Sequence, residues 1–411
     1  MPDDCYIKSV NQRSRSTLAD LSPATHRDDR ARAAFVRDLR RCVLDQGAEW
    51  IKHDYRAQVE ATLGDKLSSK DIHAAMRRRE SFRFYSALRT TSQDLLYQTV
   101  QPSIERASRE INERARHLAR AKGPGSLALD PTLKIPRSVS AIDIHLMPGS
   151  YHTEYEADDV TMGLVYDQRL RISTFGLFGP DLGDIGRSIS RYLAATMPDL
   201  NARRVLDLGC TVGHNTLPWK ETYPNAEVFG IDVAAPCLRF AHARARSIGT
   251  AINFEQMNAR ALRYPDESFD IVFSSMFLHE IPKKEIPLIL REAYRVLRPG
   301  GLMLHMELPP DDQLSAWDSF YLDWDGHYNN EPFYQGFRAS KLPTLVAAAG
   351  FAPRDYLQAV VPSWNALGEK RWREAISQKH AVDSDKTGRL TTGVRWFFFG
   401  ARKLNEQGKS K

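Results

Sequence analysis

The segment from Val205 to Asp232 constrains the fold more than any other part of the chain. It opens with the apolar run Val205–Leu208, passes through a turn that holds Gly209 and Gly213, and closes with a second apolar run that ends at Asp232. This order predicts a buried strand, a tight turn, a helix and a second parallel strand, with a ligand at the carboxyl ends of the strands. Glycines let the backbone approach that ligand closely. Asp232 follows Gly209 by 23 residues, which leaves room for one helix and lets its carboxylate accept hydrogen bonds from ribose hydroxyls.

The spacing of the two glycines distinguishes between nucleotide cofactors. A dinucleotide-binding turn needs the pattern G-x-G-x-x-G, because a pyrophosphate must reach a helix N-terminus. Here the glycines are four positions apart, and Asp207 lies beside the turn. An acid at that place repels a pyrophosphate and favours an ammonium group. S-adenosylmethionine carries an amino group, a sulfonium and a ribose but no phosphate, so the sequence predicts S-adenosylmethionine rather than a nicotinamide cofactor.

These motifs resemble those of the class I S-adenosylmethionine-dependent methyltransferases. The match continues through the run Phe269–Met276 and the turn Leu297–Leu302, and it extends over residues 165–402. It is most similar to the small-molecule branch that includes ubiquinone, menaquinone and sterol methyltransferases. Thr211 stands where the family usually has a glycine, and Asn258 where it usually has an acid. The resemblance implies an α/β fold with a doubly wound, mostly parallel, seven-stranded Rossmann-like sheet whose last two strands form an antiparallel edge hairpin.

The periodicity of the chain agrees with strands that alternate with helices, which is typical of a parallel, doubly wound sheet. We expect strands near 203–208, 227–232, 252–257, 269–274, 301–308, 355–361 and 394–402. We expect helices between the first five strands near 215–222, 235–247 and 284–297. Earlier in the chain, helices are predicted over 27–63, 69–88 and 92–122, with Pro102 dividing or kinking the last.

Chain length predicts more than one domain, because 411 residues exceed one typical domain. The run Gly123–Ser126 ends the helical region and is the expected boundary. We expect a helical N-terminal domain that completes a substrate pocket or forms a homodimer, then a connecting lid, a methyltransferase domain with an aromatic cap inserted in it, and a polar tail. Their expected bounds are 1–125, 126–190, 191–403, 310–340 for the cap and 404–411 for the tail.

Composition indicates a soluble, cytoplasmic protein. Apolar residues make up 42% of the chain and charged residues 26%, and no apolar run approaches the ~20 residues of a membrane span. The start of the chain has no signal-peptide pattern, and the four cysteines show no paired or zinc-binding spacing. We therefore expect a reducing compartment and no membrane span.

The net charge of +6 is concentrated in the first 122 residues, which hold 24 Lys and Arg against 17 Asp and Glu. A basic excess can mark a nucleic-acid partner. The arginines, however, recur among acids at helical spacing, as they do on solvated helix faces. Nucleic acid is therefore not the expected partner, and an RNA or protein methyltransferase remains an alternative.

Residues that directly follow the strands are the expected cofactor contacts. The turn after the first strand is assigned to the methionine moiety, Asp232 to the ribose, and Val233 and Asn258 to the adenine. The resemblance also places a Tyr-Asp pair, Tyr166 and Asp167, over the cofactor. The predicted cofactor-binding residues are Asp207, Gly209, Cys210, Gly213, Asn215, Asp232, Val233, Asn258, Ala259, Ser274 and Tyr166.

The segment after the fourth strand faces the transferred methyl group in the resembling family. His279 could act there as a general base, with Glu280 orienting or replacing it. His279 could instead only fix the loop, since methyl transfer to an acceptor gains most of its acceleration from proximity and orientation. A protein that keeps S-adenosylmethionine as a structural ligand without turnover is a further alternative.

Seven aromatic residues lie within eighteen positions after the fifth strand. They form either an apolar acceptor pocket over the methyl donor or a packed helical hairpin at the sheet edge. Asp323, Asp325 and His327 are alternative bases, and with Glu307 they match no metal-ligand spacing, so no metal is expected. The predicted acceptor is a small, aromatic or apolar molecule that is methylated on oxygen or carbon. Its predicted contacts are Trp317, Tyr321, Trp324, Tyr328 and Phe333.

Overall fold

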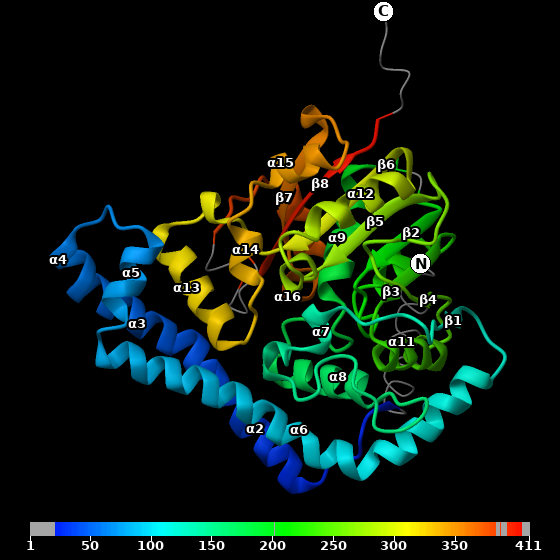
Figure 1. The fold of residues 1–411 in the computed structure, drawn as a ribbon, viewed down its shortest axis with the longest axis horizontal. Helices are drawn as coiled ribbons and strands as arrows, with labels where there is room; N and C mark the ends of the chain where they lie inside the picture. Colours follow the sequence, from blue (N-terminus) through cyan, green and yellow to red (C-terminus); the bar gives the residue numbers. More distant parts are fainter. Residues whose placement is uncertain (1–20, 201, 384–386, 388–392, 405–411) are drawn as a thin grey trace, which may run out of the picture.

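One eight-stranded sheet forms the centre of the computed structural model, which describes residues 21–200, 202–383, 387 and 393–404 (Figure 1). The strand order is β1-β4-β3-β2-β5-β6-β8-β7. The first six strands in this order are parallel, and β8 runs antiparallel to both β6 and β7. The strands are β1 (Ser126–Ala128), β2 (Arg204–Leu208), β3 (Glu227–Asp232), β4 (Asn253–Gln256), β5 (Phe269–Ser275), β6 (Leu297–Glu307), β7 (Tyr356–Pro362) and β8 (Arg395–Arg402).

The sheet has one strand more than the seven that the sequence predicts. The additional strand β1 pairs in parallel with β4, with Ser126 opposite Asn253. It has three residues and no buried side chain, so it gives no alternating apolar signal. The predicted domain boundary, Gly123–Ser126, therefore leads directly into the edge strand β1 of the sheet.

Helices cover both faces of the sheet, as a doubly wound fold requires. Successive residues of β2 point to opposite faces: Leu206 packs in the core on one face, and Val205 packs in the core on the other. The first core includes α12 (Ile286–Val296) and α15 (Leu342–Ala348). The second includes α9 (Asp184–Thr196), α10 (Leu217–Thr222), α11 (Ala235–Ser247) and α16 (Trp364–Ile376).

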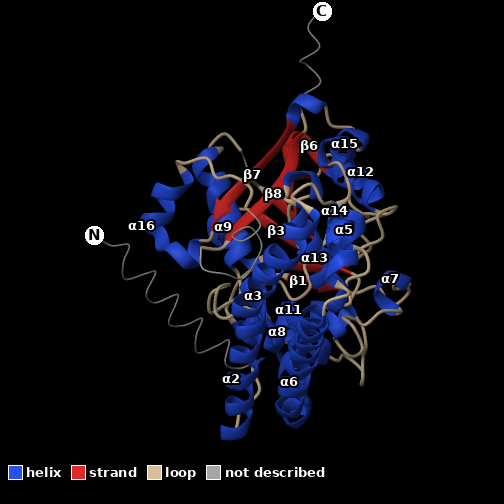
Figure 2. Ribbon diagram, turned by 90° about the vertical axis from the view of Figure 1, so that its left-hand side faces the viewer, coloured by secondary structure: helices blue, strands red, loops and turns tan. Residues whose placement is uncertain are grey.

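The N-terminal region is helical, and Figures 1 and 2 both show its two longest helices, α2 and α6, side by side. The break after α5 falls at residues 77–79, so the predicted boundary between 88 and 92 is wrong. Helix α6 continues through Pro102, which removes only one backbone donor from a long helix. The helices are α2 (Arg27–Arg41), α3 (Gly47–Tyr55), α4 (Ala61–Leu63), α5 (Ser69–Met76) and α6 (Glu80–Arg120), with π-helical turns between the first three.

Helix α13 (Ala316–Tyr328) docks the N-terminal helices onto the sheet region. Trp317 stacks on Tyr55 with ring centroids 4.5 Å apart, and Trp324 stacks on Tyr85 at 4.7 Å. These rings belong to a buried cluster that also includes side chains of α3, α5 and α6. The remaining helices are α7 (Arg137–Ser140), α8 (Thr161–Ser173) and α14 (Tyr334–Arg338). None of the helices in the described ranges combines the length and the apolar composition that crossing a membrane requires.

Candidate active site

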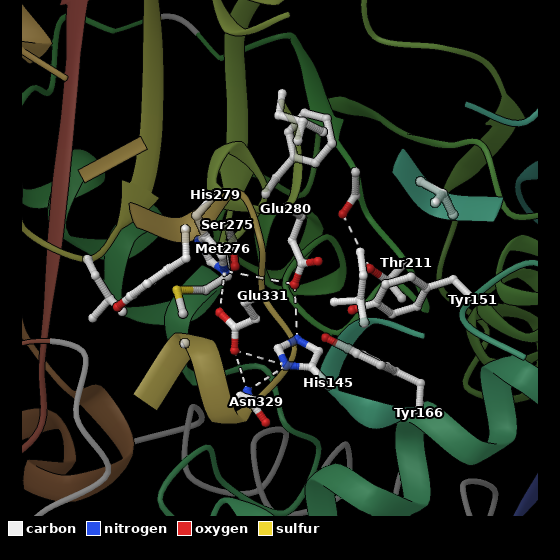
Figure 3. Close-up of a pocket in the computed structure, with 18 of the residues that line it drawn as sticks. His145, Tyr151, Tyr166, Thr211, Ser275, Met276, His279, Glu280, Asn329 and Glu331 are labelled. Carbon is white, nitrogen blue, oxygen red and sulfur yellow. Dashed lines mark hydrogen bonds and ion pairs between the residues drawn. The ribbon is translucent and has the colours of Figure 1, made fainter. Parts of the chain in front are cut away.

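A cavity of about 330 Å³ lies at the carboxyl ends of β2, β3, β4 and β5. The N-terminal helices close one side of it through α2 and α6, and the segment around His145 together with α8 and α13 closes the rest. Figure 3 shows the side chains that converge on this cavity. Its volume is in the range of small-molecule sites, and its place in the sheet is where open α/β folds bind their ligands.

Asp232 occupies the predicted ribose position at the end of β3 and lines the cavity. Its two carboxylate oxygens accept backbone hydrogen bonds from Thr211 at 3.0 Å and from Ala234 at 2.9 Å. Burial raises the pKa of this carboxyl. Since a carboxylate has about four acceptor positions, the two oxygens can still accept bonds from a vicinal diol.

The turn after β2 has no room for a side chain at position 209, so it requires a glycine there. Gly209 has φ +68°, and a Cβ at this position would lie 2.4 Å from the ring of Phe277. The neighbouring Thr211 also has a left-handed φ of 48°. The predicted residues Gly209, Asp232, Val233, Asn258, Ala259 and Tyr166 all line the cavity. The structure thus brings these six residues to one cavity, and their contacts with the parts of S-adenosylmethionine stay predictions.

Five other residues predicted to bind the cofactor do not line this cavity: Asp207, Cys210, Gly213, Asn215 and Ser274. Asp207 is buried and accepts a hydrogen bond from the Thr216 hydroxyl at 2.6 Å. Burial raises the pKa of Asp207 to about 7. Asn215 donates to the Ser275 hydroxyl at 2.9 Å, and Ser274 bonds to Nδ1 of His305 at 2.7 Å. In this structure these side chains brace the turn and the strand ends, and their contacts with the cofactor stay predictions.

His279 lies in a 3₁₀ turn after β5, and its bonded partner is Glu307 at the end of the adjacent strand β6. Oε2 of Glu307 lies 2.5 Å from Nδ1 of His279. The other oxygen of Glu307 accepts the backbone N–H groups of Phe277 and Leu278, at 2.9 and 2.6 Å. Glu307 therefore fixes both the loop and the imidazole. Sequence reasoning considered Glu307 only as a metal ligand, although its position after a central strand was a signal for a site residue.

The charge of Glu307 determines the protonation of His279. Burial alone would lower the pKa of this imidazole, but the Glu307 carboxylate outweighs it and the pKa is raised to about 9. His305, which is equally buried and has no carboxylate partner, has its pKa lowered by burial to about 3. At neutral pH a pKa of about 9 favours the imidazolium form of His279.

Glu280, predicted to orient His279, is bonded to a different histidine. Its carboxylate lies 3.0 Å from Nε2 of His145 but 3.8 Å from Nε2 of His279 (Figure 3). Glu331 lies 3.1 Å from Nδ1 of the same His145. Burial disfavours the charged form of His145, yet these two carboxylates raise its pKa above the ordinary value. Sequence analysis did not single out His145 or Glu331 as site residues, because only the fold brings them to His279.

The aromatic residues predicted to contact the acceptor lie in two different places, one at the cavity and the others away from it. Tyr321 lines the cavity, whereas Trp317, Trp324, Tyr328 and Phe333 do not. Trp317 and Trp324 instead pack on the N-terminal helices, as expected if this segment forms a packed helical hairpin.

The three alternative bases of this segment have separate places. Asp325 lines the cavity and pairs with Arg89 at 2.6 Å, whereas Asp323 pairs with Arg338 at 3.1 Å and His327 is exposed. Within the described part of the chain, no group of three or more His, Cys, Asp and Glu residues is arranged to hold a metal.

Comparison with known proteins agrees with this geometry. Residues 205–301 match a family model described as a methyltransferase domain. The chain is 39% identical over 133 residues to the demethylmenaquinone methyltransferase of Thermus thermophilus, which is 32% of this chain and 57% of that protein. It is 30% identical over 132 residues to the fatty-acid O-methyltransferase of Mycolicibacterium smegmatis, which is 32% of this chain and 47% of that protein. The chain thus spans about half the length of the curated relatives that it matches.

A solved structure with a similar arrangement is phosphoethanolamine N-methyltransferase 2 of Haemonchus contortus in complex with S-adenosyl-L-methionine. It is 20% identical, with a TM-score of 0.36 over 56% of this chain and 55% of that chain.

Residues 205–301 therefore form a methyltransferase domain, and the sheet that contains them has the doubly wound, mostly parallel order predicted from the sequence. The two relatives named above are, by their names, methyltransferases of a quinone precursor and of fatty acids.

Proposed function

We propose that this protein transfers a methyl group from S-adenosylmethionine to an ionisable hydroxyl of a small aromatic or apolar molecule. The observation that carries the proposal is the Glu307–His279 pair at the cavity, directly beside the predicted methyl-donor site. S-adenosylmethionine, when bound, supplies an electrophilic methyl on a sulfonium. Every other requirement of the reaction falls to residues of this chain.

Glu307 and His279 are suited to take the proton of the acceptor. Because Nδ1 of His279 is held by Glu307, Nε2 is the nitrogen left for an acceptor hydroxyl. A base with a pKa of about 9 is well matched to a phenol, whose ordinary pKa is ~10. Loss of the proton to His279 makes the acceptor oxygen nucleophilic inside the cavity. The acceptor therefore does not have to enter from solution as a phenolate.

Methylation of a ring carbon is a second candidate. It is favoured by the relative named demethylmenaquinone methyltransferase, to which the chain is 39% identical over the matched segment. A ring carbon also loses a proton after methylation, and His279 can accept it. The atom of the product that carries the new methyl group, oxygen or carbon, distinguishes the two candidate reactions.

The N-terminal helices belong to this site in our proposal. Arg40, Leu44, Arg89 and Gln93 of that region line the cavity. This arrangement supports a role in the acceptor pocket, and a homodimer formed by the same helices stays a prediction. It also disfavours the alternative in which these helices grip RNA or a protein.

The test has two steps. Calorimetric titration with S-adenosylmethionine should show binding to the wild type and a strong loss in Asp232→Ala. Wild-type protein and His279→Asn are then incubated with methyl-labelled S-adenosylmethionine and a panel of phenols and hydroquinones. Labelled product from the wild type, with the rate reduced about a hundredfold or more in His279→Asn, supports the proposal. Cofactor binding without labelled product from any acceptor would favour the non-catalytic alternative.

A further inference from the structure

Two arginines that come from different parts of the chain line the acceptor side of the cavity. Arg40 belongs to α2 and Arg169 to α8. They are 5% and 6% exposed. A guanidinium that is buried to this degree is normally paired with a carboxylate, because an isolated buried charge is costly.

Among the residues that the structure describes, neither of these arginines has a carboxylate in hydrogen-bond or ion-pair contact. Arg40 donates from Nη1 to the side-chain oxygen of Gln93 at 2.6 Å and to the carbonyl of Ser92 at 3.3 Å, both neutral groups. Arg169 has no hydrogen bond or ion pair to any residue that the structure describes, and its guanidinium lies 4.8 Å from the centre of the Tyr166 ring. The Nε atoms of both arginines are buried without a partner.

Most acceptor positions of the carboxylates around the cavity are occupied by other residues, although Oε2 of Glu280 is buried without a hydrogen-bond partner. Glu280 and Glu331 bond to His145, and Asp325 is paired with Arg89 at 2.6 Å. Arg89 is thus a guanidinium in the same cavity that does have its carboxylate, which makes the two unpaired ones unusual. Burial, together with the neighbouring positive charge of Arg89, lowers the pKa of Arg40 to about 9. For Arg169, neighbouring groups that include Glu280 outweigh burial and raise the pKa, so the unfavourable state that a bound anion would relieve is that of Arg40.

We propose that Arg40 and Arg169 form an anion-binding subsite that selects small acceptors carrying a carboxylate. The proposal rests on the proposed methyltransferase function and adds the class of its substrate. A guanidinium binds a planar carboxylate with two parallel hydrogen bonds, which fixes orientation as well as position. The carboxylate would anchor the acceptor at this end of the cavity and present its hydroxyl to His279.

A carboxylate can reach these arginines from two sources, since the methionine part of S-adenosylmethionine also carries one. Arg169 lies over Tyr166, a predicted cofactor contact, so it is within reach of either source. Arg40 bonds to Gln93 and lies beside Arg89, both from the N-terminal helix α6 that closes the acceptor side. Arg40 is therefore the residue that separates the two sources.

The experiment is a calorimetric titration of the full chain, saturated with S-adenosylhomocysteine, with benzoate and with its neutral counterpart benzamide. The wild type should bind benzoate at least tenfold more tightly than benzamide. In Arg40→Gln, benzoate affinity should fall at least tenfold, while the affinities for benzamide and S-adenosylhomocysteine stay unchanged. Arg37→Gln is the matched control, because Arg37 is on the same helix and is exposed, and its ion pair is with the adjacent Asp38.

Each other outcome contradicts the proposal in a defined way. Equal affinity of the wild type for benzoate and benzamide would exclude an anion subsite. A parallel loss of S-adenosylhomocysteine affinity in Arg40→Gln would assign the anion to the methyl donor. If the wild type does not bind S-adenosylhomocysteine, the proposed function fails, and the same pair of titrations without it still tests the subsite. If Arg40→Gln does not fold, Arg40→Lys replaces it, because lysine keeps the charge but cannot form two parallel hydrogen bonds to a carboxylate; an unchanged benzoate affinity in Arg40→Lys would then contradict the proposal.

Discussion

Replacing Glu307 by glutamine should reverse the protonation of His279. Glutamine keeps the shape of the side chain and one oxygen that can still accept the N–H groups of Phe277 and Leu278. It removes the negative charge 2.5 Å from Nδ1 of His279. Burial then acts on the imidazole without compensation from its closest carboxylate.

The size of the effect follows from two histidines of this structure. With its carboxylate, the pKa of His279 is raised to about 9, and without one the pKa of the buried His305 is lowered to about 3. In Glu307→Gln we expect the pKa of His279 to fall from about 9 toward its ordinary value of 6.5, because burial still lowers it while Glu280 and Glu331 still raise it. A fall over this whole range corresponds to about 3 kcal/mol of lost stabilisation of the imidazolium. The glutamine amide also favours the tautomer with its proton on Nε2, so the methylation rate should fall about a hundredfold or more.

NMR titration of the histidine ring protons measures this pKa directly, with His279→Asn identifying the signal. In the wild type, the rate of methyl transfer should rise as pH increases toward about 9, because only then does the neutral base form. Glu374→Gln, a change at an exposed residue of α16, should leave both observations unaltered. A wild-type His279 that titrates at or below 6.5, or a midpoint that Glu307→Gln does not move, would refute the reasoning.

Four further outcomes are expected. Asp232→Ala should weaken S-adenosylmethionine binding about a hundredfold by calorimetry, because charge-assisted hydrogen bonds to the ribose are lost. Gly209→Ala should lower the free energy of unfolding by about 1–3 kcal/mol in denaturant titration, since its Cβ would lie 2.4 Å from a ring. Trp324→Ala, at a stacked and buried ring, should lower it by about 3–5 kcal/mol. Because the pKa of His279 is raised in the folded state, its contribution to the free energy of unfolding should be complete below pH 6.5 and should be lost as pH rises through about 9. In urea titrations over this pH range, the free energy of unfolding of His279→Asn should fall less than that of the wild type.

The amino-acid sequence by itself determined the core of the fold and half of the site. Alternating apolar runs specify strands through their local period, and the turn around Gly209 needs a left-handed backbone that few residues adopt. Asp232 could be predicted because it ends its strand, and the carboxyl end of a parallel strand is a ligand position in any sheet of this kind. The strand β1 escaped prediction because three residues carry no period.

Tertiary structure alone decided the chemistry of the acceptor side. Glu307 reaches His279 because β5 and β6 are neighbours in the sheet, and no local pattern records which strands pair. In the same way, Arg40 and Arg169 line one cavity only because the N-terminal helix α2 packs against α8. Local sequence sets backbone conformation, whereas charges interact through space. The pKa of a histidine and the substrate class of a cavity therefore depend on residues that only the complete fold brings together.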